Sequence, residues 1–203
     1  MEFESMPAVA SWLHRDVRSG FEVLFVETSP GRISLRGTTT AVEGNSTWAV
    51  GYVVDLDEHW NTQGVVATNA TVRGEARRAI QRLGAGRWAI DGVHDPALDG
   101  CSDVDFESSS VTNAIPIHRM AFDVGETVEA PAAFVRADDL SVVRIEQQYT
   151  LVGIGDREIT FDYISVTFGF ACRLTFDASG LILDYQVSRF VTASGRYRQP
   201  GRG

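Results

Sequence analysis

The sequence predicts an all-β fold in which long antiparallel strands form a strongly curved sheet, an incomplete barrel. Apolar and polar residues alternate with a period of two along most of the 203 residues, which is typical of strands that bury one face. Short segments rich in Gly, Asn, Asp and Ser separate these runs and have the composition of tight turns. Because strands joined by short turns usually pair as neighbours, we expect an antiparallel meander with little helix.

The expected strands follow one another along the chain, and each shows the same alternation. In the last of them every even position from Ile164 to Phe176 is apolar, so we expect one buried face and a sharp bend near Gly169. Hairpin turns are expected at residues 30–31, 43–45, 123–126 and 178–180, and other turns at 84–86 and 153–155. The strands are expected at residues 21–26, 33–42, 48–55, 65–72, 128–135, 142–151, 159–163 and 164–176.

The composition predicts one globular domain. With 44% hydrophobic and 22% charged residues, the chain has enough apolar material for a sizeable core, and all-β domains commonly reach this length undivided. We expect this domain to span residues 1–193. Residues 194–203 contain three arginines among glycines and are expected to form a flexible tail.

The charges exclude several function classes. A formal charge of −9 disfavours nucleic acid and anionic membrane surfaces as partners. All 18 basic residues are arginine, so the chain has no lysine for a phosphate-binding loop, a pyridoxal phosphate Schiff base or a kinase site.

The expected location is the cytoplasm. Residues 1–20 lack the apolar run of a signal peptide, and no segment approaches the roughly 20 apolar residues of a transmembrane helix. Cys101 and Cys172 form no CxxC pair and are expected to be free thiols.

The loop at residues 91–106 concentrates carboxylates around His94 and Cys101. Such oxygen density suits Ca²⁺ or Mg²⁺, but the spacing matches no EF-hand, and Asp beside Gly is how turns are ordinarily built. We therefore favour turns over a metal site. Asp103 and Asp105 alternate with apolar residues, so their side chains should share one face of a short strand. The carboxylates of the loop are Asp91, Asp95, Asp99, Asp103 and Asp105.

Arg119 is the expected partner of these carboxylates. It alternates with Ile115 and Ile117, which predicts an inward-facing position on a strand, and a buried arginine favours a bidentate carboxylate. Pro116 indicates an edge strand or bulge there. Two roles of such an Asp–Arg pair are open: fixing the strand register, or binding a ligand. The first is favoured.

Aromatic and amide side chains provide further candidates. The four tryptophans are expected mainly in the core, but Trp60 lies in a polar connection between strands and is the one least explained as core. At Gln147-Gln148-Tyr149, whichever amide points inward needs a protein partner, a water molecule or a ligand. The signatures G-x-S-x-G and H-E-x-x-H do not occur, so we assign no catalytic residue.

Three segments, at residues 86–92, 98–105 and 112–119, resemble a bacterial family of glycolipid-binding proteins, formerly a domain of unknown function. The likeness extends to residues 20–22 and 180–185. It implies a curved β-sheet around an apolar cavity, similar to the bacterial lipoprotein carriers, and glycolipid binding. His118 stands where the family is expected to have arginine, and residues 151–158 look divergent. The matching positions are Trp88, Asp91, Asp99, Cys101, Asp103, Asp105, Thr112, Asn113, Pro116 and Arg119.

The leading hypothesis is a non-enzymatic binder or carrier of a lipid or glycolipid, with a polar mouth formed by residues 91–119. It requires neither a cofactor nor a metal. The alternatives are an enzyme that uses Asp103 or Asp105 as acid or base, and an assembly protein that covers a sheet edge by forming a homodimer. The candidate ligand-binding residues are Trp60, Trp88, Asp91, Asp99, Asp103, Asp105, Asn113, Arg119, Gln148 and Tyr149.

Overall fold

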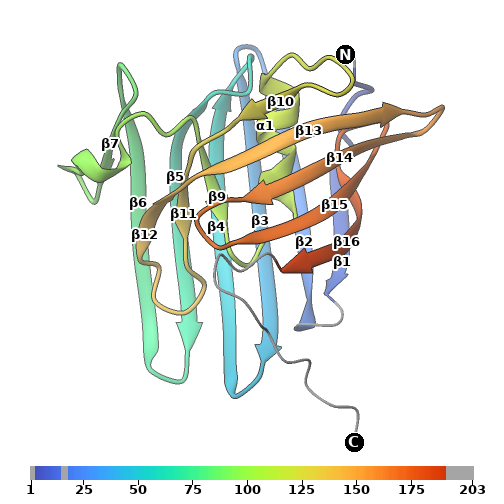
Figure 1. The fold of residues 1–203 in the computed structure, drawn as a ribbon. Helices are drawn as coiled ribbons and strands as arrows, with labels where there is room; N and C mark the ends of the chain where they lie inside the picture. Colours follow the sequence, from blue (N-terminus) through green and yellow to red (C-terminus); the bar gives the residue numbers. More distant parts are fainter. Residues whose placement is uncertain (1–2, 15–17, 191–203) are drawn as a thin grey trace, which may run out of the picture.

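The computed structural model describes residues 3–14 and 18–190, with side chains through residue 184. It is an all-β structure with three separate sheets, none of which closes into a barrel (Figure 1). The long strands of an eight-stranded sheet stand behind a five-stranded sheet, whose strands cross them steeply. The predicted fold class is therefore confirmed. The predicted tail at residues 194–203 lies outside the described residues.

The eight-stranded sheet is an antiparallel meander in chain order. The β3–β4 pair runs without a register shift from Arg32 opposite Asp57 to Glu43 opposite Ser46. Gly31 (φ 74°) and Gly44 (φ 59°) take the left-handed conformations that the two adjoining hairpin turns require. The strands are β1 (Val9–His14), β2 (Ser19–Ser29), β3 (Arg32–Glu43), β4 (Ser46–Asp57), β5 (Thr62–Thr71), β6 (Gly74–Gly84), β7 (Arg87–Ile90) and β8 (Val93–His94).

The remaining strands form two smaller sheets. One has the order β10-β13-β14-β15-β16 and is antiparallel, and the other has the order β12-β11-β9, with β9 parallel to β11. Their bounds are β9 (Asp103–Phe106), β10 (Thr127–Glu129), β11 (Ala132–Val135), β12 (Val142–Ile145), β13 (Gln147–Ile154), β14 (Glu158–Ser165), β15 (Phe170–Asp177) and β16 (Ile182–Phe190). Two 3₁₀ turns, η1 (Pro96–Leu98) and η2 (Val111–Asn113), and the helix α1 (Ala114–Arg119) complete the described elements.

Three predicted strands are wrong in this second half. Residues 128–135 and 142–151 each divide into two strands of different sheets, because the chain crosses between sheets at Pro131 and at Glu146. Residues 164–176 reverse direction at Gly169 (φ 59°), so the expected bend is a hairpin turn between β14 and β15. Ile164, 41% exposed, is consequently on the outer face.

The expected strand at residues 115–119 is also wrong, because these residues belong to α1. Pro116 lies in the first helical turn, where a backbone N–H has no partner within the helix, so the proline costs no hydrogen bond there. The turn at residues 123–126 follows this helix and therefore joins no hairpin, and the turn expected at 153–155 overlaps the last two residues of β13. Strands β1, β6, β7, β8 and β16 were not predicted.

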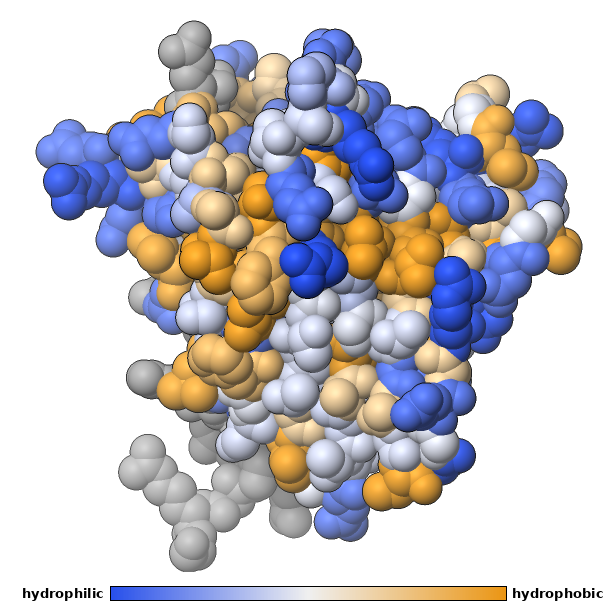
Figure 2. Space-filling view, turned by 180° about the vertical axis from the view of Figure 1, so that it is seen from behind, coloured by the Kyte–Doolittle hydropathy of each residue, from blue (hydrophilic) through white to orange (hydrophobic). Residues whose placement is uncertain are grey.

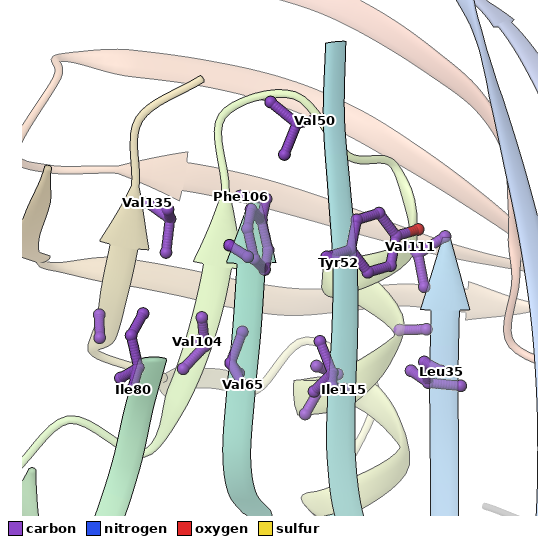
Figure 3. Close-up of a cluster of buried hydrophobic side chains, with 14 of the residues drawn as sticks. Leu35, Val50, Tyr52, Val65, Ile80, Val104, Phe106, Val111, Ile115 and Val135 are labelled. Carbon is purple, nitrogen blue, oxygen red and sulfur yellow. The ribbon is translucent and has the colours of Figure 1, made fainter. Parts of the chain in front are cut away.

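Two main hydrophobic clusters hold the layers together. The first lies between the inner face of the eight-stranded sheet and the segments β9, η2, α1 and β11 (Figure 3). The second lies under the five-stranded sheet and includes Phe161, Leu174 and Phe176. Helix α1 contributes Ile115 to the first cluster and Ile117 to the second, so it joins the two. Cys101 and Cys172 are free, as predicted, and both are buried.

The outer face of the eight-stranded sheet carries exposed hydrophobic residues. Figure 2 shows hydrophobic side chains gathered on this side of the molecule. From β1 and β2 they include Val9, Leu13, Phe21 and Phe25, which are 42–61% exposed. None of the helices in the described part of the chain has the length and apolar character needed to cross a membrane.

Candidate functional site

Strand β9 and helix α1 are joined by the predicted ion pair. Arg119 donates from Nε to Asp103 Oδ1 (2.9 Å) and from an η nitrogen to Asp103 Oδ2 (2.8 Å). The Asp103 side chain is 1% exposed and that of Arg119 18%. Both oxygens of this buried carboxylate are therefore engaged by one guanidinium, which is the geometry that stabilises such a pair.

Asp105 has a different environment on the same strand. Its Oδ1 accepts hydrogen bonds from the Thr112 hydroxyl (2.6 Å) and from the Phe106 backbone N–H (2.9 Å). Burial raises the pKa of Asp105 to about 6, and the negative charge of the nearby Asp103 acts in the same direction. Close by in the chain, Asn113 Oδ1 accepts a hydrogen bond from the Tyr149 hydroxyl (2.9 Å), which ties η2 to β13.

Glu22 is a buried polar residue that the sequence analysis missed. It is 0% exposed, and it accepts hydrogen bonds from the Tyr52 hydroxyl (2.7 Å), the Ser109 hydroxyl (2.5 Å) and the Ser110 backbone N–H (2.7 Å). Burial raises its pKa. The signal was present, since Glu22 alternates with the inward-facing Leu24 of the same strand.

We call Glu22, Asp103, Asp105, Asn113 and Arg119, with their partners, the buried polar network. It connects the eight-stranded sheet, β9, α1 and β13 through side chains that the protein itself satisfies. Five of the predicted site residues belong to this network. They are Asp103, Asp105, Asn113, Arg119 and Tyr149, the last as the partner of Asn113. Their contacts explain how the 103–119 segment is held in place, and they leave little for a ligand to bind.

The other predicted residues lie elsewhere. Trp88 is fully buried and donates its indole N–H to the Cys101 carbonyl (3.0 Å), so it belongs to the core. Asp91 pairs with Arg78 (2.5 Å), and Asp99 with His94 (2.9 Å), both near the surface. Gln148 is half-buried on the face of β13 opposite to Tyr149.

Asp95 of the 91–106 loop behaves as a turn residue. Its Oδ1 accepts the Ala97 N–H (3.0 Å) and caps η1. Within residues 3–14 and 18–190, no group of three His, Cys, Asp or Glu residues is placed to hold a metal ion.

Trp60 lies at an open groove on the molecular surface. It occupies the β4–β5 turn with φ 63°, a left-handed conformation that few bulky residues adopt, and its backbone N–H bonds to the Asp57 carbonyl (3.0 Å). Its ring is 9% exposed and stacks on His118, with centroids 3.7 Å apart and planes 7° apart. The groove has a volume of about 470 Å³ and is lined by Phe3, Glu4, Ser5, Met6, Thr28, Ile33, Trp60 and His118. We call it the aromatic groove.

His118 is the centre of the aromatic groove. Phe3 approaches its ring with centroids 4.1 Å apart. Burial lowers the His118 pKa to about 4, so the imidazole is neutral at physiological pH and donates its Nε2–H to the Ser179 carbonyl (3.0 Å). Gly180 is needed beside it, because a Cβ there would lie 2.3 Å from His118 Nε2.

This fold and this groove define a class: all-β proteins built from a curved antiparallel meander covered by a second sheet. The chain belongs to the family described as "Putative glycolipid-binding", which matches residues 9–189. Its fold is similar to the crystal structure of a DUF1089 family protein from Pseudomonas aeruginosa, with a TM-score of 0.70, 24% sequence identity, and coverage of 86% of this chain and 91% of that one. Among curated proteins, none matches this chain.

Proposed function

We propose that this protein binds a glycolipid non-covalently, at the aromatic groove. The observation that carries the proposal is the Trp60–His118 stack at an opening whose walls combine aromatic, aliphatic, hydroxyl and carboxylate groups. Aromatic faces bind the apolar faces of sugar rings, while hydroxyl and carboxylate oxygens bind the sugar hydroxyls. The family to which the chain belongs supports the same ligand class.

The expected cavity under the curved sheet has less support. In the described residues, that region is filled by the first core cluster, including Leu35, Tyr52 and Phe106 (Figure 3). Two hollows formed by the described residues, the aromatic groove and one lined by Asp57, Asn61 and Arg82, are both open to solvent. Carriage of a lipid in an enclosed cavity would require these side chains to rearrange, so we place the ligand in the groove.

The contacts of the two carboxylates do not favour the enzyme alternative. Asp103 is engaged on both oxygens by Arg119, and Asp105 is buried with Thr112 as its partner. Neither lines the aromatic groove. An acid or base must reach a substrate proton directly or through one water molecule, and these positions offer no such approach.

Self-association is a second candidate role, because β1 is an edge strand of the eight-stranded sheet and exposes Val9 (56%) and Leu13 (61%). Mass measurement by light scattering on the wild-type protein and on Leu13→Asp tests it. A dimer that the substitution converts to monomer is the expected result, and a wild-type monomer at all concentrations rejects this role.

Native mass spectrometry of the protein purified from its own host tests glycolipid binding. We expect a co-purifying molecule that solvent extraction releases and that contains both sugar and acyl chains. The second arm adds vesicles with and without a glycosyl diacylglycerol to the extracted protein. A protein that is empty in every preparation and shows no preference for the glycolipid vesicles would reject the proposed function.

A further inference from the structure

We propose that the Phe3 side chain is a built-in plug of the aromatic groove, and that an uncharged pyranose ring binds by taking its place on the His118 ring. This inference rests on the proposed function and adds the position and the chemical class of the headgroup. In the protein without ligand, the phenyl ring thus occupies the position that we assign to the sugar ring.

The ring geometry places Phe3 where a sugar would stack. The Trp60 and Phe3 centroids lie 3.7 Å and 4.1 Å from the His118 centroid. Two rings at these distances would collide on one face of the imidazole, so they occupy opposite faces. Trp60 therefore covers one face of the His118 ring, and the Ser179 carbonyl accepts its Nε2–H. The face that Phe3 covers is the one that can accept a ligand.

The segment that holds Phe3 permits this exchange. Over residues 3–7 the described backbone hydrogen bond is that from Glu4 N to the Ala178 carbonyl (2.9 Å). Phe3 is itself only half-buried. Rotation of the phenyl ring out of the groove leaves this hydrogen bond intact, so the exchange costs the contact with His118 and the packing of Phe3 against the second core cluster.

The charges of the aromatic groove select the headgroup. None of the eight described residues that line it is an arginine, and His118, with a pKa lowered to about 4, is neutral. Glu4 is exposed at the rim and, among the described contacts, has no ion-pair partner. Among the described lining residues, a phosphate headgroup would meet only this negative charge, whereas the hydroxyls of an uncharged sugar can donate to the Glu4 carboxylate and the Thr28 hydroxyl.

Calorimetric titration with n-octyl β-D-glucoside and with octyl phosphate, both below their micelle concentrations, tests the headgroup class. The two probes share one chain and differ only in the headgroup. We expect the wild-type protein to bind the glucoside and to bind octyl phosphate about tenfold more weakly or worse. Equal binding of the two probes would overturn the assignment of an uncharged sugar.

The plug itself is tested by substitution. Phe3→Ala should bind the glucoside about fivefold more tightly, because the competing internal contact is gone. Trp60→Leu should bind it about tenfold more weakly, because the support behind His118 is lost. Phe168→Ala is the matched control, since Phe168 is an aromatic residue 43% exposed on another surface, and its affinity should equal that of the wild type. Thermal unfolding confirms that each variant is folded.

NMR of the wild-type protein tests the plug without any substitution. Glucoside binding should shift the NMR signals of the Phe3 and His118 rings together, because the two rings separate. Unchanged affinity in Phe3→Ala with unshifted Phe3 signals would overturn the plug while leaving glycolipid binding intact. Failure of every variant to bind the glucoside or glycolipid vesicles would instead reject the proposed function and this inference with it.

Discussion

The buried polar network and the aromatic groove both contain carboxylates and aromatic side chains, but they differ in whether the protein itself supplies the hydrogen-bond partners of the polar groups. In the network, Glu22 and Asp103 have protein partners at hydrogen-bond distance. In the groove, Glu4 and the Trp60–His118 stack face an opening to solvent. Buried polar groups that the protein satisfies stabilise the fold, whereas groups left facing an opening are available to a ligand. The two regions should therefore respond to substitution in opposite ways.

The largest effect is expected in the network, for Asp103→Ala. This substitution leaves the Arg119 guanidinium largely buried without its carboxylate, which should lower the free energy of unfolding by about 3–4 kcal/mol. Chemical denaturation measures it. Arg173→Ala, which breaks an exposed pair with Asp162 (2.9 Å), is the control and should cost less than about 1 kcal/mol. Similar losses in the two variants would contradict the distinction between the regions.

The titration of Asp105 should make stability depend on pH. Its pKa rises from 3.8 to about 6 on folding, so the folded protein binds the proton more tightly than the unfolded chain. The stabilising contribution is therefore complete below about pH 4 and is lost as the pH rises through 6. At about 1.4 kcal/mol per pKa unit, the loss is about 3 kcal/mol.

Asp105→Asn isolates this contribution, because the amide oxygen can still accept from Thr112 and does not titrate. Unfolding free energies of wild type and variant, compared from pH 4 to pH 7, should diverge in favour of the variant as the pH rises. Parallel curves would show that Asp105 has an ordinary pKa.

Gly180→Ala connects the two regions, since it acts on the groove through a buried contact. The added Cβ would meet the His118 ring, and Gly180 has φ 77°, so we expect a loss of about 2 kcal/mol and weakened glycoside binding. Gly31→Ala is matched in backbone conformation (φ 74°) but has open space around its Cβ. It should cost about 1 kcal/mol and leave binding unchanged. If Gly180→Ala and Gly31→Ala changed glycoside binding equally, the position of the His118 ring would have no role in binding.

The smallest effect is expected for Tyr52→Phe. It removes the hydroxyl that donates to Glu22 and leaves the Ser109 and Ser110 donors in place, so stability should fall by about 1 kcal/mol. Denaturant unfolding checks this value, and unchanged glycoside binding is expected beside it. A loss of binding would show that the network and the groove are coupled.

The sequence predicted the first half of the fold better than the second. Residues 33–42 and 48–55 lie within β3 and β4, because in a meander each strand keeps one face inward and the next strand is its neighbour. Residues 128–135 were also predicted as one strand, yet the chain there passes from one sheet to another. A period of two records which side of a strand is buried, but not which sheet the strand joins.

The same limit explains why helix α1 was predicted as a strand, although the pairing of Arg119 with a carboxylate was predicted correctly. Ile115, Ile117 and Arg119 alternate as on a strand, and six residues are too few for a helical period to show. Arg119 nevertheless faces inward and pairs with Asp103 as predicted, because a buried guanidinium requires a carboxylate in either secondary structure. Trp60 was predicted to be the tryptophan least explained as core, but it is 9% exposed and belongs to the first core cluster, and it also lines the groove.

The sequence by itself determined the all-β class, the meander of long strands, their turns and the need of Arg119 for a carboxylate, because these depend on local alternation and on the chemistry of single residues. Only the tertiary structure decided the division into three sheets, the engagement of Glu22 by Ser109, and the aromatic groove. Phe3, Ile33, Trp60 and His118 come from four distant segments of the chain. Contacts of that kind are fixed by how the sheets pack, and no local pattern records them.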